Sequence, residues 1–209
     1  MIYLSDDYLT KYQDVLAYIL ERAASEKYSF SYIEKVVAYS EPFSELEKSN
    51  ITYIAFSSSE FIYNKLFPEK DNNGFISNIY GPYGWAGYNY IKLFLDLQTT
   101  FETLFIIFPL QKMLDAYHLY HEMDYSQLIQ LVKSEIKFSY LNMIMTAKKY
   151  SSSLLAEKTG IPFSTINALR YGDRDIDKYE SIKLLKISNV LGVKMSSLLT
   201  SIQLVCNNT

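Results

Sequence analysis

The chain has 209 residues and a net charge of −3, with 49% hydrophobic and 21% charged residues. This balance is typical of a folded protein, and the length excludes a large multidomain enzyme. The only cysteine, Cys206, excludes an intramolecular disulfide and a cysteine-rich zinc site. The longest strongly apolar stretch, residues 103–110, is too short to cross a bilayer, and the acidic N-terminus does not resemble a secretory signal. We therefore expect a cytoplasmic protein without a membrane segment.

Charge and tyrosine are unevenly distributed along the chain. Residues 1–135 contain 10 Lys and Arg against 18 Asp and Glu, a net charge of −8, whereas residues 136–209 contain 10 against 5, a net charge of +5. Of the 20 tyrosines, 16 precede residue 136. We therefore predict an acidic, tyrosine-rich interaction or dimerisation domain over residues 1–132 and a basic domain over residues 133–209, with an anionic partner for the basic one.

Helical spacing of apolar residues dominates the first domain, which predicts a mainly α fold class. Ser5, followed by two aspartates, is typical of a helix start, and the periodicity continues to about residue 20. Proline disfavours helix in the residue before it, so a second helix over residues 31–38 is predicted to end near Pro42. Further helices are predicted from Ser58 or Ser59 to before Pro68, over Trp85–Leu97, and from a Thr100 cap over Phe101–Tyr120, kinked or divided at Pro109.

Three stretches of the first domain lack helical signals. Ile51–Phe56 is short, apolar and β-branched at its start, which is compatible with one short strand or hairpin. Asn and Gly tolerate positive φ, so Asp71–Gly74 is predicted to be a turn, and Gly81–Gly84 is expected to be irregular. The domain boundary near residue 132 carries no linker signal, and a continuous helix can bridge it.

The second domain contains a helix-turn-helix pattern. Ser151–Ser153 supplies an N-cap for a short helix over Leu154–Thr159, and Gly160 suits the left-handed conformation that ends a helix. Ser164 is predicted to cap the next helix, Thr165–Tyr171. Two short helices joined by a glycine-containing turn predict a helix-turn-helix. The helix before this pair is predicted from a face formed by Ile136, Tyr140, Ile144 and Ala147.

A longer residue pattern extends over residues 136–202. It combines a small residue where two helices cross, a glycine for the tight turn, and aliphatic anchors beneath the third helix. Its residues are Leu155, Ala156, Gly160, Ile161, Thr165, Ile166, Gly172, Leu191, Gly192, Val193, Leu198 and Leu199. With this pattern, residues 136–202 resemble the lambda-repressor-like (Cro/XRE-type) DNA-binding domain. The resemblance implies a five-helix domain whose third helix enters the major groove of DNA while the second crosses the backbone.

The same resemblance implies which residues contact DNA. An asparagine amide can pair with adenine, a serine can contact bases or phosphate, and an aromatic ring can pack on a thymine methyl. Relatives commonly carry Gln or Arg at the places of Phe163 and Ala168, and the loop over residues 173–177 is acidic where many relatives are basic. The expected base contacts are Phe163, Ser164, Asn167 and Ala168, and the expected phosphate contacts are Lys148, Ser152, Arg170, Arg174 and Lys178.

Two functions remain open at this point. The first is a sequence-specific DNA-binding transcriptional regulator that binds double-stranded DNA as a homodimer and needs no cofactor. The segments Trp85–Tyr88 and Tyr120–Asp124 are similar to small uncharacterised Firmicute proteins with a repressor-like domain. That similarity implies an antitoxin or autoregulator of a toxin–antitoxin or mobile-element locus, with a toxin as protein partner. The alternative is a phage or mobile-element inhibitor, anti-CRISPR-like, whose acidic domain occupies a host nuclease.

An enzyme is not expected. His118 and His121 lie three residues apart near Glu122 and Asp124, which places two potential metal ligands on one helical face. No HExxH, GxSxG or phosphate-loop pattern accompanies them, so we predict no metal and no catalytic residue. The aromatic residues of Trp85–Tyr90 are interpreted as core material, with a protein-contact patch as the alternative.

Overall fold

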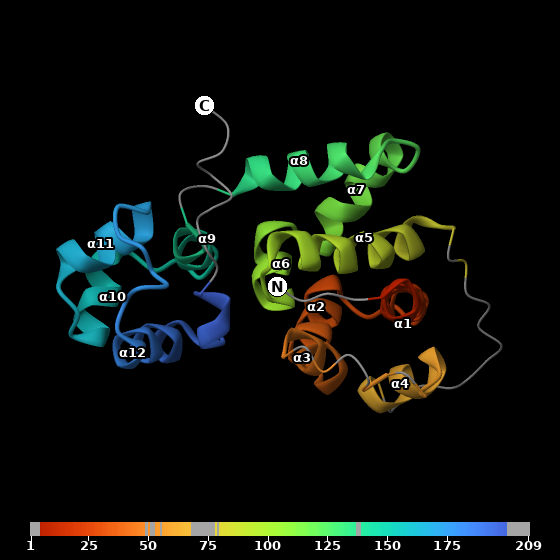
Figure 1. Ribbon diagram of the computed structural model, residues 1–209, viewed down its shortest axis with the longest axis horizontal. Coiled ribbons are helices and arrows are strands. Elements are labelled where there is room, and N and C mark those ends of the chain that lie inside the picture. Colours follow the sequence, from red (N-terminus) through yellow and green to blue (C-terminus); the bar gives the residue numbers. More distant parts are fainter. Residues whose placement is uncertain are drawn as a thin grey trace. The chain divides into compact units, whose positions relative to one another are not determined.

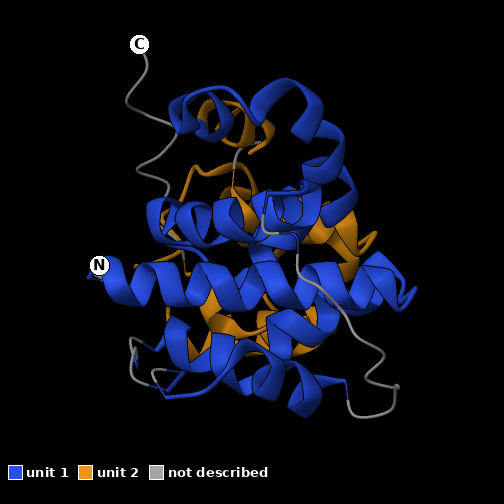
Figure 2. Cartoon of the chain, turned by 90° about the vertical axis from the view of Figure 1, so that its right-hand side faces the viewer, with its two compact units in different colours: residues 1–129 blue, residues 130–209 orange. Residues whose placement is uncertain are grey.

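The computed structural model describes residues 5–48, 50, 53–54, 56–67, 78, 80–136 and 139–199. Over this part of the chain it contains twelve α-helices and one short 3-10 helix and no strand, which confirms the mainly α fold class (Figure 1). The chain divides into two compact units, residues 1–129 and 130–209 (Figure 2). This division falls within one helix, α8 (Tyr125–Glu135). The boundary that was predicted between residues 132 and 133 lies in the same helix.

None of the described helices is both long enough and apolar enough to cross a bilayer.

The first unit is built around α1 and α5, the pair of helices that make the most extensive contact with each other. Residues on most sides of α1 are buried between positions 12 and 23, because α2, α4 and α5 all pack on it. The helices of this unit are α1 (Asp6–Ser25), α2 (Phe30–Tyr39), α3 (Glu41–Glu47), α4 (Ser59–Leu66), α5 (Pro82–Leu97), α6 (Phe101–Ile107) and α7 (Leu110–Tyr120), followed by the start of α8.

Three predicted helix starts in the first unit are confirmed. Ser5 is the N-cap of α1, the Ser58 hydroxyl accepts a hydrogen bond from the Phe61 amide at 3.0 Å, and the Thr100 hydroxyl accepts one from the Thr103 amide at 3.2 Å. The Ser58 and Thr100 side chains bind first-turn amides that lack a partner within the helix, whereas Ser5 makes no side-chain cap. The predicted division at Pro109 is also confirmed, since α6 ends at Ile107 and α7 begins at Leu110.

The second helix ends before Pro42 as predicted, but two helices carry a proline in their first turn that was not predicted there. The second helix ends at Tyr39, and Pro42 lies in the first turn of a new helix, α3. Likewise the stretch Gly81–Gly84 is not irregular, because α5 begins at Pro82. A first-turn residue has no intrahelical use for its amide, so proline opens a helix as readily as it ends one.

The proposed strand or hairpin at residues 51–56 is not found in the described part of this stretch, where Tyr53, Ile54 and Phe56 lie in turns. The rest of the stretch, and the predicted turn at Asp71–Gly74, lie outside the described residues.

Helices α1 and α5 cross at backbone contact. A Cβ atom built on Gly87 would lie 2.4 Å from the Ala17 amide nitrogen and 2.5 Å from its Cα, which no side chain can occupy. Polar groups hold the same crossing: Gln13 Nε2 donates to the Tyr88 carbonyl oxygen at 3.2 Å, and the Tyr88 hydroxyl donates to the Asp14 carboxylate. The glycine therefore sets the distance between the two helices.

Carboxylates from neighbouring helices cap α6 and α7. Glu34 Oε1 on α2 accepts from the Leu110 amide at 2.6 Å, and Glu47 Oε1 on α3 accepts from the Phe101 amide at 3.0 Å. Pro109, the N-cap of α7, makes no side-chain cap. Burial raises the pKa of Glu34, and the hydrogen bond from Leu110 opposes that rise. A helix N-terminus favours negative charge, so these contacts fix the helices through their ends.

The second unit is a smaller helical bundle in which α10 packs on α11 and α12, and α11 on α9. The expected fifth helix is a single 3-10 turn, and its neighbour Leu198 is fully buried. Ile136 lies before the first of these helices, whose N-cap is Ser139, so the predicted face begins one turn too early. After α8, the helices are α9 (Tyr140–Ala147), α10 (Ser152–Thr159), α11 (Phe163–Tyr171), α12 (Ser181–Leu191) and η1 (Met195–Ser197).

The variant Gly87→Ala tests the α1–α5 crossing, because a close crossing predicts that it lowers the free energy of unfolding and an open one that it raises it. On helix propensity alone it would stabilise α5 by about 1 kcal/mol. Overpacking against the Ala17 backbone instead predicts a net loss of about 1–3 kcal/mol in the free energy of unfolding. Urea unfolding, followed by the fluorescence of Trp85, measures this loss. Trp85 is the only tryptophan and lies in the same helix as Gly87.

Adding Ala17→Gly provides the control. The contacts are with Ala17 backbone atoms, so removing its methyl group should not restore stability. A stabilised Gly87→Ala variant, or rescue by the second substitution, would contradict the backbone contact.

Candidate nucleic-acid interface

Helices α10 and α11 are joined by a sharp turn. Gly160 ends α10 with φ of +68° in the left-handed region, where a side chain is strained. Beyond the turn, Ile161, Ile166 and Leu169 are buried, as predicted for the anchors of the second helix of the pair. The prediction that Ser164 caps this helix was wrong, because α11 begins at Phe163 and its N-cap is Pro162.

The opposite side of α11 carries the four expected base-contact residues. Phe163 is 53% exposed, Ser164 is exposed, and Asn167 and Ala168 are half-buried. Phe163 and Asn167 are four residues apart, as are Ser164 and Ala168, so the two pairs lie side by side over the first turns of the helix. The structure thus presents an amphipathic helix whose N-terminal half is accessible.

A hydrogen-bond network ties α11 to α9 and α10. The Ser152 hydroxyl donates to Asn167 Oδ1 at 3.2 Å and accepts from Arg170 Nη1 at 3.2 Å. Arg170 Nε donates to Asn142 Oδ1 at 2.8 Å, and the Ser139 hydroxyl donates to the Arg170 carbonyl oxygen at 2.6 Å. Buried polar groups need such partners, and two of these bonds are donated by the guanidinium of Arg170.

Two of the expected phosphate contacts belong to this network. Ser152 is buried and Arg170 is half-buried, with their side-chain groups bonded inside the unit. Sequence reasoning missed Asn142 and Ser139 as their partners. Ser139 carries a signal of its own, since its hydroxyl caps α9 by accepting from the Asn142 amide at 3.1 Å.

The other three expected phosphate contacts are exposed and lie outside the hydrogen-bond network around Arg170. Lys148, at the end of α9, donates to the Gly192 carbonyl oxygen at 3.4 Å. Arg174 lies with its guanidinium carbon 5.8 Å from the ring centroid of Tyr179. Lys178 pairs with Asp175 at 3.2 Å and lowers the pKa of that carboxyl. Because the Lys178 side chain is 84% exposed, this ion pair stabilises the loop little.

Further cations of the second unit were not selected from the sequence. Lys149, which follows α9, is exposed and has φ of +57°. Lys158, on α10, donates to the Tyr150 hydroxyl at 3.3 Å and lies 5.2 Å from the centroid of that ring. Together with Lys148 they place three lysines around the start and end of α10, which contributes to a positive potential beside α11.

Both histidines of the pair lie against the Tyr117 ring. His121 Nδ1 lies 2.8 Å from the Tyr117 carbonyl oxygen, and its ring stacks on Tyr117 at 4.5 Å between centroids. Within the described ranges, no three His, Cys, Asp or Glu side chains are grouped so as to hold a metal ion.

No protein-family model, no curated protein and no solved structure matches this chain.

The variant Arg170→Lys separates a structural role of this residue from a phosphate contact. Lysine keeps the charge but cannot reproduce the forked contacts to Asn142 and Ser152. Losing these two hydrogen bonds predicts a loss of about 1–3 kcal/mol in the free energy of unfolding. Urea unfolding followed by circular dichroism measures this loss, with Arg174→Lys on the exposed loop as the matched control. Equal stability of Arg170→Lys and the parent chain would assign Arg170 to the surface.

Proposed function

We propose that this protein is a sequence-specific DNA-binding transcriptional regulator of the lambda-repressor-like type, acting in the cytoplasm. The observation that carries the proposal is the α10–α11 pair, in which three buried aliphatic residues anchor one side of α11 and leave a polar, accessible side. This division suits a helix that enters the major groove. The net charge of +5 over residues 136–209 supports an anionic partner.

Asn167 is the residue to which we assign most of the base preference. Its Oδ1 accepts from Ser152, and no described residue accepts from its Nδ2 group. The Ser152 bond therefore orients the amide, leaving its donor for N7 of adenine or another acceptor at a base edge. Phe163 and Ala168 offer apolar contact with a thymine methyl, and Ser164 offers a hydroxyl.

We propose that the protein acts as a homodimer. A single recognition helix contacts few base pairs, and two half-sites one helical turn apart supply the additional affinity. Helix α12 offers an apolar pair for this contact, because Ile182 is 73% exposed and Leu185, three residues on, is 50% exposed. The acidic first unit then remains for a protein partner, which for an antitoxin or autoregulator is the toxin of the same locus.

Two substitutions distinguish base recognition from phosphate contact. Asn167→Ala should relax the preference among duplexes selected from a random library, because it removes a base-edge contact. Lys148→Ala should weaken binding to all duplexes and reduce the slope of log K against log salt by about 1. Mobility-shift titrations at several salt concentrations measure both effects.

Lys35→Ala is the matched control, since it removes an equal charge from an exposed lysine of the first unit. It should leave both the preference and the salt slope unchanged. Retained preference in Asn167→Ala together with an unchanged slope in Lys148→Ala would discard this docking mode.

The alternative function is an inhibitor of a host nuclease carried by a phage or mobile element. The charge of −8 over residues 1–135 favours it, because a carboxylate-rich surface can occupy a nucleic-acid channel. Capture of a nuclease by the full chain, without retention of any duplex in the titrations above, would favour the inhibitor over the regulator.

The dimer contact on α12 is tested by Ile182→Asp. Light scattering after size exclusion should give twice the 24.3 kDa chain mass for the parent protein and the single-chain mass for the variant, because a charge is buried at the contact. Leu119→Asp, at a 67% exposed position of α7, should remain dimeric. A parent chain that is monomeric, or a dimer in both variants, would contradict the assignment of α12.

A further inference from the structure

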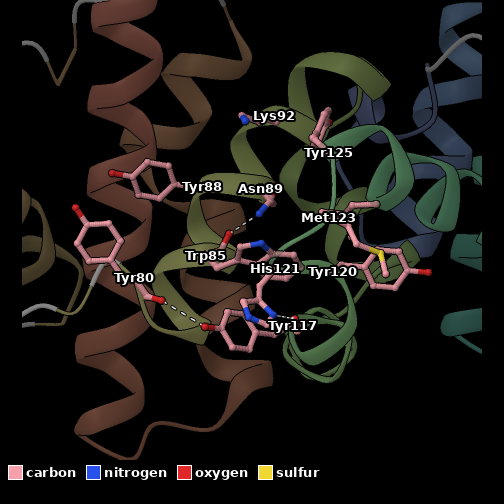
Figure 3. Close-up of a pocket in the computed structure, with 11 residues that line it drawn as sticks. Tyr80, Trp85, Tyr88, Asn89, Lys92, Tyr117, Tyr120, His121, Met123 and Tyr125 are labelled. Atoms are coloured by element: carbon pink, nitrogen blue, oxygen red, sulfur yellow. Dashed lines mark hydrogen bonds between the residues drawn. The ribbon is translucent and has the colours of Figure 1, made fainter.

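The first unit contains a cavity of about 510 Å³ bounded by α5, the C-terminal end of α7 and the start of α8 (Figure 3). This volume lies within the range of small-molecule sites. Along α5 the lining residues are Trp85, Tyr88, Asn89 and Lys92, and the spacing of four and three places Trp85, Asn89 and Lys92 on one helical face. The aromatic segment interpreted as core from the sequence therefore contributes one wall of a cavity.

Aromatic rings that contact one another form the adjoining wall. The Tyr117 ring meets Trp85 edge-to-face at 5.6 Å between centroids and stacks on His121 at 4.5 Å. The Tyr117 hydroxyl donates to the Tyr80 carbonyl oxygen at 3.4 Å, which fixes the ring further. Such contacts hold flat apolar surfaces in place before a ligand arrives, and this lowers the entropic cost of binding.

The lining contains few polar groups, and two of them are the Asn89 amide and the Lys92 ammonium group. Asn89 is 8% exposed; its Nδ2 donates to the Trp85 carbonyl oxygen at 2.8 Å, while no described residue donates to its Oδ1. Lys92 Nζ lies 5.3 Å from the Tyr125 ring centroid. Of the described residues that line the cavity, Lys92 is the only one with a permanent charge. Figure 3 shows Lys92 and Tyr125 at one end of the lining, and Tyr117 with His121 at the other.

We propose that this cavity binds a small planar aromatic molecule that carries one anionic group, a carboxylate or a phosphate. The ring lies against Trp85 and Tyr117, and the anion lies toward Lys92. Asn89 Oδ1 accepts a hydrogen bond from a donor on the ring or its substituent. A cationic ligand suits the aromatic walls but meets the Lys92 ammonium without a compensating carboxylate in the lining. This site is independent of the helix-turn-helix and stands if DNA binding fails.

Isothermal titration of the full chain with a matched set of naphthalenes tests both halves of the proposal. 2-Naphthoate and 2-naphthyl phosphate present the ring with either anion, 2-naphthalenemethanol removes the charge, and cyclohexanecarboxylate removes the planar ring. At least one aromatic anion should bind at least about tenfold more tightly than either control, since a charged hydrogen bond contributes about 1.5–3 kcal/mol. Whichever anion binds more tightly identifies the acidic group.

Lys92→Gln should weaken the preferred aromatic anion about tenfold and leave 2-naphthalenemethanol unchanged. Lys112→Gln is the matched control, because Lys112 Nζ also lies 5.3 Å from a ring centroid, that of Phe108, but outside the lining. Circular dichroism checks that each variant is folded. The proposal is overturned if neither aromatic anion binds at about 1 mM, if either control compound binds equally well, or if the two lysine variants behave alike.

Discussion

The first unit depends on one constraint, the backbone contact between α1 and α5 at Gly87. Because no Cβ fits against Ala17, the two longest described helices approach more closely than side chains would allow. The face of α5 that holds Trp85, Asn89 and Lys92 is then positioned by the opposite face of the same helix. The position of this cavity wall therefore depends on the α1–α5 crossing, in which the lining residue Tyr88 also takes part through its bonds to Gln13 and Asp14.

The second unit positions its exposed helix in a different way. Aliphatic anchors hold α11 from below, and the guanidinium of Arg170 joins it to side chains of α9 and α10. Apolar burial is non-directional, whereas the hydrogen bonds fix the rotation of the helix about its axis. The orientation of Asn167 depends on this network, since its amide oxygen is bonded to Ser152.

Local signals predicted much of the fold. The mainly α class follows from the apolar period, and the starts at Ser58 and Thr100 follow from capping side chains, which act within one turn. Ser5 is the N-cap of α1 without a side-chain bond, and two aspartates follow it in the first turn. The end of the second helix before Pro42 was predicted correctly, but the helix starts at Pro42 and Pro82 were missed, because a proline has the same local chemistry at the end of one helix and in the first turn of the next. Of the candidate interface, the buried anchors could be predicted, but the bonds of Arg170 could not. They join residues 18 and 28 positions apart, and no spacing rule links such pairs. The cavity escaped prediction for the same reason, since α5 and α7 meet only in the folded unit.

Helix α8 has a practical consequence for dividing the chain. It begins at Tyr125, beside the cavity, and continues through Leu128 and Val132, both buried and one turn apart, to Glu135. Cleavage of the chain between residues 129 and 130 would separate these two side chains and leave each product with a helical stub too short to persist in water. A fragment that retains the cavity must therefore carry the whole of α8.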